Sequence, residues 1–141
     1  MIYQGSCHCG NLSFEFETAL GPAELPLRAC QCTFCRRHGA LSTSDPQGSL
    51  HLRAAEVDQV QRYRFGLGIT DFLICRRCGV YLLAMMDIDG GRYAVMNAAA
   101  LERRAELTGA VQPMEYAGED EAARLARRKQ RWTPITRSEG L

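Results

Sequence analysis

Seven cysteines in closely spaced groups constrain this chain more than any other feature of its sequence. Cys7 and Cys9 are separated by one residue, Cys75 and Cys78 by two, and the CQCTFC segment of residues 30–35 combines both spacings. An odd number of thiols leaves at least one outside any intramolecular disulfide scheme, and the spacings within a group are too tight for bridges. Free cysteines also serve as small apolar core residues, but these spacings favour metal binding.

Four of the cysteines predict a closed metal site. In an extended backbone the side chains of Cys7 and Cys9 project from the same face, and the turn of a C-x-x-C motif brings Cys75 and Cys78 toward one centre. Gly10 and the glycine at position 79 follow the two pairs and permit a tight chain reversal. The two pairs together predict a structural zinc ion bound by four thiolates.

The middle group supplies three thiolates, from Cys30, Cys32 and Cys35. A zinc ion with three protein ligands keeps a fourth position for water or substrate, which is the arrangement of catalytic zinc. We therefore expect two zinc ions per chain, one structural and one open, with these three cysteines as the catalytic group. Thiolates also bind iron and iron–sulfur clusters, so the spacing leaves iron as an alternative.

Three histidines are further candidates for the open position or for acid–base chemistry. His8 alternates with two cysteines and should point to the opposite face of a strand. His38 follows the middle group by three residues and could turn toward it. His51 lies between two leucines and is most simply an outward-facing strand residue.

Basic residues flank both groups of cysteines. Arg28, Arg36 and Arg37 surround the middle group, where they could lower thiol pKa values or bind an anionic ligand, although they could also simply face solvent. Arg76 and Arg77 lie inside the C-x-x-C motif, and we expect both to face solvent.

Overall composition limits the classes of function. The 141 residues carry a formal net charge of +1, so no global electrostatic attraction to nucleic acid or anionic membranes is expected. No apolar run approaches the roughly 20 residues that cross a bilayer, and the N-terminus lacks the features of a signal peptide. We therefore expect a cytoplasmic protein whose thiols stay reduced.

Short strands separated by turn residues predict a mostly β domain with antiparallel sheets. The clearest strand spans Leu12 to Glu17, where Leu12, Phe14 and Phe16 alternate with polar residues. Five more are expected over residues 50–53, 63–65, 72–74, 80–86 and 93–96.

One helix is expected late in the chain, over Glu119 to Arg131. Its basic residues are best interpreted as a solvated helix face, with a nucleic-acid patch as the alternative. Trp132 should anchor the end of the helix by packing. We expect a single zinc-binding β domain over residues 1–132 and a mobile tail over residues 133–141.

The segments GSCHCG, CQCTFCRRHGA and ICRRCG resemble the glutathione-dependent formaldehyde-activating enzyme family, which includes centromere-protein-V-like members. The resemblance spans roughly residues 1 to 100. It implies a β-tent fold of antiparallel sheets with zinc-ribbon-like knuckles, a structural zinc on the outer cysteine pairs and a second zinc on the middle group. One position departs from the family pattern C-H-C-x-x-C, because Gln31 stands in place of the histidine.

These observations predict a zinc-dependent carbon–sulfur lyase or synthase that acts on the adduct of a small aldehyde with a glutathione-type thiol. Two other functions remain open. One is a non-catalytic zinc scaffold that binds a protein, and the other is a zinc-ribbon nucleic-acid binder. A pocket that opens onto the middle cysteines would favour the enzyme.

Overall fold

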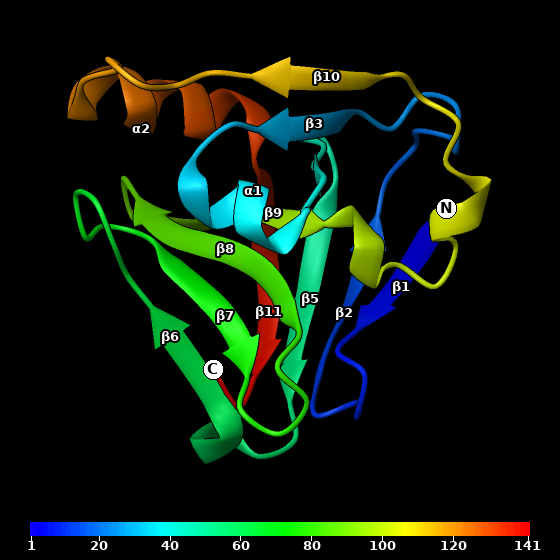
Figure 1. Cartoon of the computed structure of the whole chain (residues 1–141). Helices are drawn as coiled ribbons and strands as arrows, with labels where there is room; N and C mark the ends of the chain where they lie inside the picture. Colours follow the sequence, from blue (N-terminus) through cyan, green and yellow to red (C-terminus); the bar gives the residue numbers. More distant parts are fainter.

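A computed structural model describes residues 1–141 and contains eleven strands that form one continuous, folded sheet. One wall of the sheet consists of β1 (Ile2–Ser6), β2 (Leu12–Glu17), β5 (Ser49–Ala54) and β11 (Thr133–Glu139), in that order. Figure 1 shows this wall on one side of the molecule, inclined to the remaining strands. β11 joins the two parts, because it pairs with β5 on one side and with β9 on the other.

The second wall contains β9 (Gly91–Asn97), β8 (Tyr81–Ile88), β7 (Asp71–Cys75) and β6 (Val60–Tyr63), each antiparallel to its neighbour. These strands lie opposite the first wall in Figure 1.

Three short strands extend the sheet from β9 across the top of the molecule as drawn in Figure 1. They are β4 (Ser42–Thr43), β3 (Leu27–Cys30) and β10 (Val111–Met114). The remaining elements are the helices α1 (Thr33–His38) and α2 (Glu121–Arg131), with 3-10 turns at Val57–Gln59, Ala98–Ala100 and Arg104–Glu106.

The main core lies between the two walls. In β2 the apolar residues Leu12, Phe14 and Phe16 are fully buried, whereas the alternate residues face outward, as the strand period requires. β8 has two buried faces, so its residues divide between two clusters: Leu83 and Met85 join the main core, and its other face packs elsewhere.

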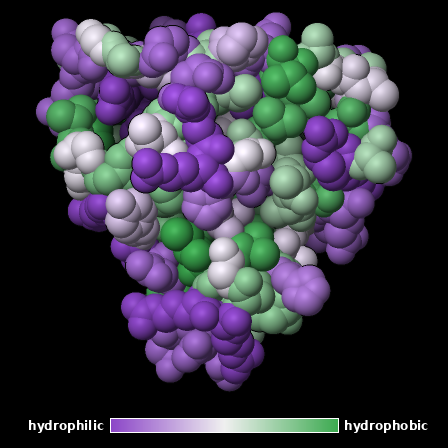
Figure 2. All heavy atoms as spheres, viewed as in Figure 1, coloured by the Kyte–Doolittle hydropathy of each residue, from purple (hydrophilic) through white to green (hydrophobic).

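A second apolar cluster covers the other face of β8 and is closed by α2. It contains Phe72, Tyr81, Met86 and Trp132 among its buried members, and Leu125 of α2 packs against it. Polar residues cover most of the surface seen in Figure 2, with small apolar areas between them.

Local signals explain the limits of α2. The side chain of Asp120 accepts a hydrogen bond from the backbone N–H of Ala123, which satisfies one of the free donors at the helix N-terminus. Basic residues occupy the last turn, where they interact favourably with the helix dipole. The helix begins two residues later than predicted, and Trp132 is buried at its end as expected.

The mostly β fold with a C-terminal helix is confirmed, and four features differ from the predictions. The sheet is mixed, because β10 pairs with β3 and β11 with β5 in parallel. The expected strand over 63–65 lies mainly earlier, at Val60–Tyr63, and α1 was not predicted. The outward direction expected for His51 agrees with its pairing opposite Glu15, although charged side chains of neighbouring strands cover the ring and bury it.

The fourth difference is the C-terminal tail, which was predicted to be mobile and is instead strand β11. Thr133 is fully buried, and its hydroxyl accepts a hydrogen bond from the backbone N–H of Asp45 at 2.8 Å. The strand is rich in polar residues because its later part is exposed, so its sequence resembles a loop. Backbone pairing with two strands fixes it despite that composition.

Candidate metal centres and the adjoining pocket

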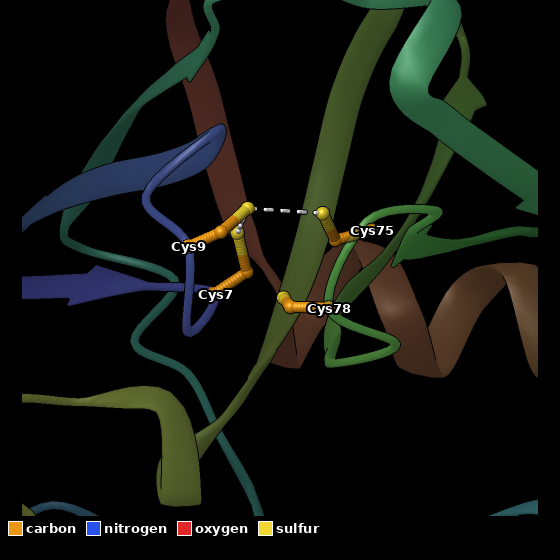
Figure 3. A group of neighbouring side chains, drawn as sticks. All are labelled: Cys7, Cys9, Cys75 and Cys78. Carbon is orange, nitrogen blue, oxygen red and sulfur yellow. Dashed lines mark hydrogen bonds between the residues drawn. The ribbon is translucent and has the colours of Figure 1, made fainter.

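The outer cysteine pairs meet in space (Figure 3). Cys7 and Cys9 come from the turn between β1 and β2, whereas Cys75 ends β7 and Cys78 lies in the turn that leads to β8. The Sγ atoms of Cys7 and Cys9 are 3.7 Å apart, and those of Cys9 and Cys75 are 3.5 Å apart. Gly79 adopts a positive φ of 80° directly after the second pair, which supports the tight turn.

The four thiols and the distances between their sulfurs fit a tetrahedrally coordinated metal ion. Zinc–sulfur bonds of about 2.3 Å at tetrahedral angles place neighbouring sulfurs about 3.8 Å apart, close to the observed distances. All four sulfurs lie within 4.8 Å of one another. This group could therefore hold a metal ion, and a four-thiolate set is consistent with zinc.

Protonation differs sharply between these thiols. Burial raises the pKa of Cys7 to about 12, and sulfur contacts with the neighbouring cysteines add to the effect. Burial also opposes ionisation of Cys78, but hydrogen bonds from the backbone at Cys9 and Val80 and from neighbouring thiols outweigh it and lower the pKa to about 6. The group already carries negative charge near neutral pH, and a divalent cation would favour full deprotonation.

The middle cysteines also converge. Cys30 ends β3, Cys32 is the N-cap of α1, and Cys35 lies in the first turn of that helix, so their three sulfurs are within 4.8 Å of one another. The backbone N–H of Cys35 donates to the Sγ of Cys32 at 3.4 Å. Gly39 closes the helix with a positive φ of 61°. This group could likewise hold a metal ion, with one fewer protein ligand.

The three middle thiols share charge unequally. The hydrogen bond from Cys35, with smaller contributions from the Cys32 backbone and thiol, lowers the pKa of Cys30 to about 6 despite its burial. The same contact, together with burial, raises the pKa of Cys35. One thiolate is thus available near neutral pH to begin metal binding.

None of the three histidines joins either group of sulfurs. His8 is exposed, in agreement with its expected direction away from the cysteines. His38 is also exposed, and its ring packs against Phe34 at 4.5 Å between centroids. Gln31, which departs from the family pattern, donates a hydrogen bond to the backbone carbonyl of Ala29.

A cavity of about 130 Å³ opens onto the middle cysteines and runs beneath α2. Its lining combines aromatic and apolar residues with basic ones. The aromatic and apolar residues include Phe65, Phe72, Tyr81, Val95 and Trp132.

Of the basic residues that line the cavity, only Arg28 was expected from the sequence to lie beside the middle cysteines. The basic residues are five arginines: Arg28, Arg124, Arg127, Arg128 and Arg131. The prediction that the basic residues of α2 form a solvated face is therefore wrong for Arg124, Arg127 and Arg128, which are partly buried, whereas Arg131 is exposed. The signal that could have shown this burial is the spacing of Arg124, Arg128 and Trp132, which recur every four residues on one helix face.

The other flanking arginines lie outside the cavity. Arg36 and Arg37 of α1 are exposed. Arg76 and Arg77 are exposed as expected, and Arg77 pairs with Glu56 at 2.6 Å. The arginines that line the cavity beside the middle cysteines thus come from β3 and α2, not from α1.

Comparisons with known proteins agree with the cysteine pattern. A crystal structure of a protein from Rhodobacter sphaeroides is 29% identical to this chain, with a TM-score of 0.59, and the match covers 79% of this chain and 99% of the other. No curated protein matches the chain. In this structure no helix has the length and apolar character needed to span a membrane. The family model described as glutathione-dependent formaldehyde-activating enzyme matches residues 2–116, so the chain belongs to that family.

Proposed function

We propose that this protein is a zinc-dependent carbon–sulfur lyase or synthase that forms and cleaves the adduct of a glutathione-type thiol with a small aldehyde. Family membership supports the substrate class. The observation that carries the proposal is the cavity that opens onto a group of three cysteines rather than four. A purely structural zinc site needs neither an open position nor an adjoining cavity.

The two groups of cysteines would have different roles. Cys7, Cys9, Cys75 and Cys78 would hold a structural zinc. The catalytic zinc would be held by Cys30, Cys32 and Cys35. When bound there, zinc supplies a positive centre that lowers the pKa of a ligand thiol, so that the thiolate exists at neutral pH.

The reaction conserves atoms and electrons without a further reactant. In the synthase direction the thiolate sulfur forms a bond to the carbonyl carbon, the π electron pair of the carbonyl moves to oxygen, and a proton reaches that oxygen. The lyase direction breaks the same carbon–sulfur bond and returns the aldehyde and the thiol.

The chain's own residues would position the reactants. Phe72 and Trp132 exclude water from part of the cavity, which strengthens electrostatic interactions inside it. Tyr81 also lines the cavity, and burial raises its pKa, so its hydroxyl stays protonated. That hydroxyl could donate a hydrogen bond to the oxygen on which negative charge develops.

The proposal is tested by calorimetric titration of glutathione into the zinc-loaded protein. We expect saturable binding by wild type, and loss of that binding in Cys35→Ser. Cys9→Ser is the matched control, because it removes a thiol of the same chemistry from the four-cysteine group. At temperatures below the Tm of this variant, it should still bind glutathione. Binding that is unchanged by Cys35→Ser would reject the role of the middle cysteines.

Catalysis is tested separately by exchange NMR on glutathione mixed with formaldehyde. The zinc-loaded protein should accelerate interconversion of free glutathione and its hydroxymethyl adduct beyond the rate in buffer. No acceleration by a protein that binds glutathione would favour the alternative of a non-catalytic binding module.

The cavity also separates the proposal from nucleic-acid binding. Arg127 pairs with Glu119 at 2.8 Å, and its guanidinium lies 3.6 Å from the ring centroid of Tyr116. These contacts within the protein occupy its guanidinium. Arg128 is directed under the helix instead of along an open surface. A backbone-tracking groove would need its arginines exposed.

A further inference from the structure

The cavity contains more positive charge than its surroundings neutralise. Five arginines line it, whereas none of its lining residues is Asp or Glu. Glu119 lies nearby and pairs with Arg124 and Arg127. It supplies one negative charge, and a zinc ion bound by three thiolates supplies a formal charge of minus one. The two neutralise fewer than half of the five arginines.

Arg128 is the most constrained of these side chains. Its Nη1 donates to the hydroxyl of Thr70 and to the sulfur of Met86, and its guanidinium lies 4.6 Å from the ring centroid of Trp132. Its Nε is buried and has no hydrogen-bond partner. No carboxylate pairs with Arg128, although its guanidinium is partly buried and an unpaired charge is costly where water is excluded.

Arg28 presents a second guanidinium that has no carboxylate partner. Its Nη1 donates to the hydroxyl of Ser44 at 2.9 Å, and that hydroxyl donates to the backbone carbonyl of Arg131 at 2.6 Å. Ser44 is buried and holds Arg28 of β3 against the end of α2. The two elements thus fix Arg28 and Arg128 on the same cavity.

We propose that Arg28 and Arg128 form an anion subsite that binds a carboxylate of the thiol substrate while its sulfur occupies the middle cysteine group. The inference deepens the proposed function and rests on it. A guanidinium matches a carboxylate through two parallel hydrogen bonds, and the apolar wall beside it strengthens the pairing. The substrate class is therefore an anionic thiol, or its aldehyde adduct, with a carboxylate within reach of the sulfur.

One of the two arginines of this subsite lies outside the part of the chain that defines the family, and Arg28 lies inside it. The family match ends at residue 116, whereas Arg128 and the rest of α2 follow it. Selection among thiols would consequently be set jointly by Arg28 of β3 and by the C-terminal helix, and the sulfur chemistry by the middle cysteines.

A simpler role for the arginines is to balance the negative thiolates. Burial, Arg127 and Arg124 lower the pKa of Arg128, and the negative charges of Glu119 and Cys30 only partly oppose them. If charge balance were their only role, a ligand carboxylate would gain nothing from them, and the experiment below separates the two cases.

Three related ligands separate the carboxylate from the sulfur. They are 3-mercaptopropionate, its neutral methyl ester, and 3-(methylthio)propionate, in which the sulfur is blocked. Each is titrated into the zinc-loaded full chain and followed by the fluorescence of Trp132, the only tryptophan, which lines the cavity. We expect the free acid to bind about tenfold or more tightly than its ester, as a charge-assisted pair predicts.

Variants then assign the preference to Arg128. Arg128→Met should reduce the acid-to-ester ratio to about one, and Arg128→Lys should restore part of it. Arg36→Met is the matched control: it removes one positive charge from an exposed position near the middle cysteines and should leave the ratio unchanged. Circular dichroism checks that each variant is folded. The comparison of the three ligands in the wild-type protein tests the subsite even if a variant does not fold.

The outcomes distinguish the two proposals. Equal binding of acid and ester overturns the anion subsite and leaves the thiol chemistry standing. Binding of the acid and of the blocked ligand with equal affinity supports the subsite but rejects sulfur binding, and with it the proposed function. A preference for the acid that persists in Arg128→Met overturns the assignment to this side chain. No binding of any ligand overturns both.

Discussion

Replacing either C-x-C step by Ser-x-Ser should destabilise the protein to very different extents. The double variant Cys7→Ser/Cys9→Ser removes one arm of the four-cysteine group. That group joins two turns far apart in sequence, since Cys9 and Cys75 are 66 positions apart. In the chain-entropy model, a cross-link over a loop of this length stabilises the fold by about 4 kcal/mol.

The matched variant Cys30→Ser/Cys32→Ser makes the same chemical change in the middle group. The loop between Cys30 and Cys35 is short, and the same relation gives about 2 kcal/mol. Burial widens the difference, because Cys7 is only 2% exposed and a serine there would bury a hydroxyl. We therefore expect a gap of at least about 2 kcal/mol between the two variants.

Thermal unfolding measures this gap. For a chain of 141 residues, 4 kcal/mol corresponds to a fall in Tm of about 12 °C, and the middle-group variant should lose about half as much. Metal analysis accompanies the melts, with two zinc ions per wild-type chain and one in each variant. Equal Tm losses in the two variants, or a Tm within about 3 °C of wild type for the first, would refute the reasoning.

Three further predictions follow from the C-terminal half. Deleting residues 133–141 should leave no cooperative melt by circular dichroism, since it removes the strand that joins the two walls; a folded truncation product would contradict this. Arg127 and Arg124 hold the pKa of Glu119 below 4.5, so the ionised carboxylate stabilises the fold above that pH and loses its effect as pH falls through the lowered folded pKa. In acid unfolding followed by Trp132 fluorescence, Glu119→Gln should therefore lose less stability than wild type as pH falls through this range. Tyr81→Phe should lower kcat about tenfold or more while glutathione affinity stays within about twofold, and an unchanged kcat would exclude the hydroxyl.

The sequence was sufficient for the features that depend on local spacing. Alternation in residues 12–17 predicted β2 residue for residue, because one face of that strand is buried and the other is wet. The spacings of the seven cysteines predicted two groups, and the structure brings together the same sets of four and three. The acidic start and basic end of α2 located it within two residues.

Features fixed by distant partners were not predictable in this way. α1 has only six residues, and its cap is a cysteine, which is not among the usual capping residues. β11 is polar because its later part is exposed, and it is held by backbone pairing with strands more than 35 residues earlier in the sequence. The arginines of α2 resembled a solvated face because the spacing of Arg124, Arg128 and Trp132 marks a shared helix face but not the strands β3 and β8 that lie beneath it.

The same residue type serves two purposes in this fold because the surroundings of the two groups differ. The four-cysteine group lies at the edge of the main core, where Cys7 and Cys75 are buried and four sulfurs leave no position for a ligand. The three-cysteine group lies on the opposite face of β8, where α2 covers a cavity instead of supplying a fourth sulfur. Because β11 fixes α2 to both walls, the segment that follows the family match also determines what can approach the open side of the middle group. Under the two proposals, a carboxylate-bearing thiol would use both kinds of lining at once, with its sulfur at the cysteines and its charge at the arginines.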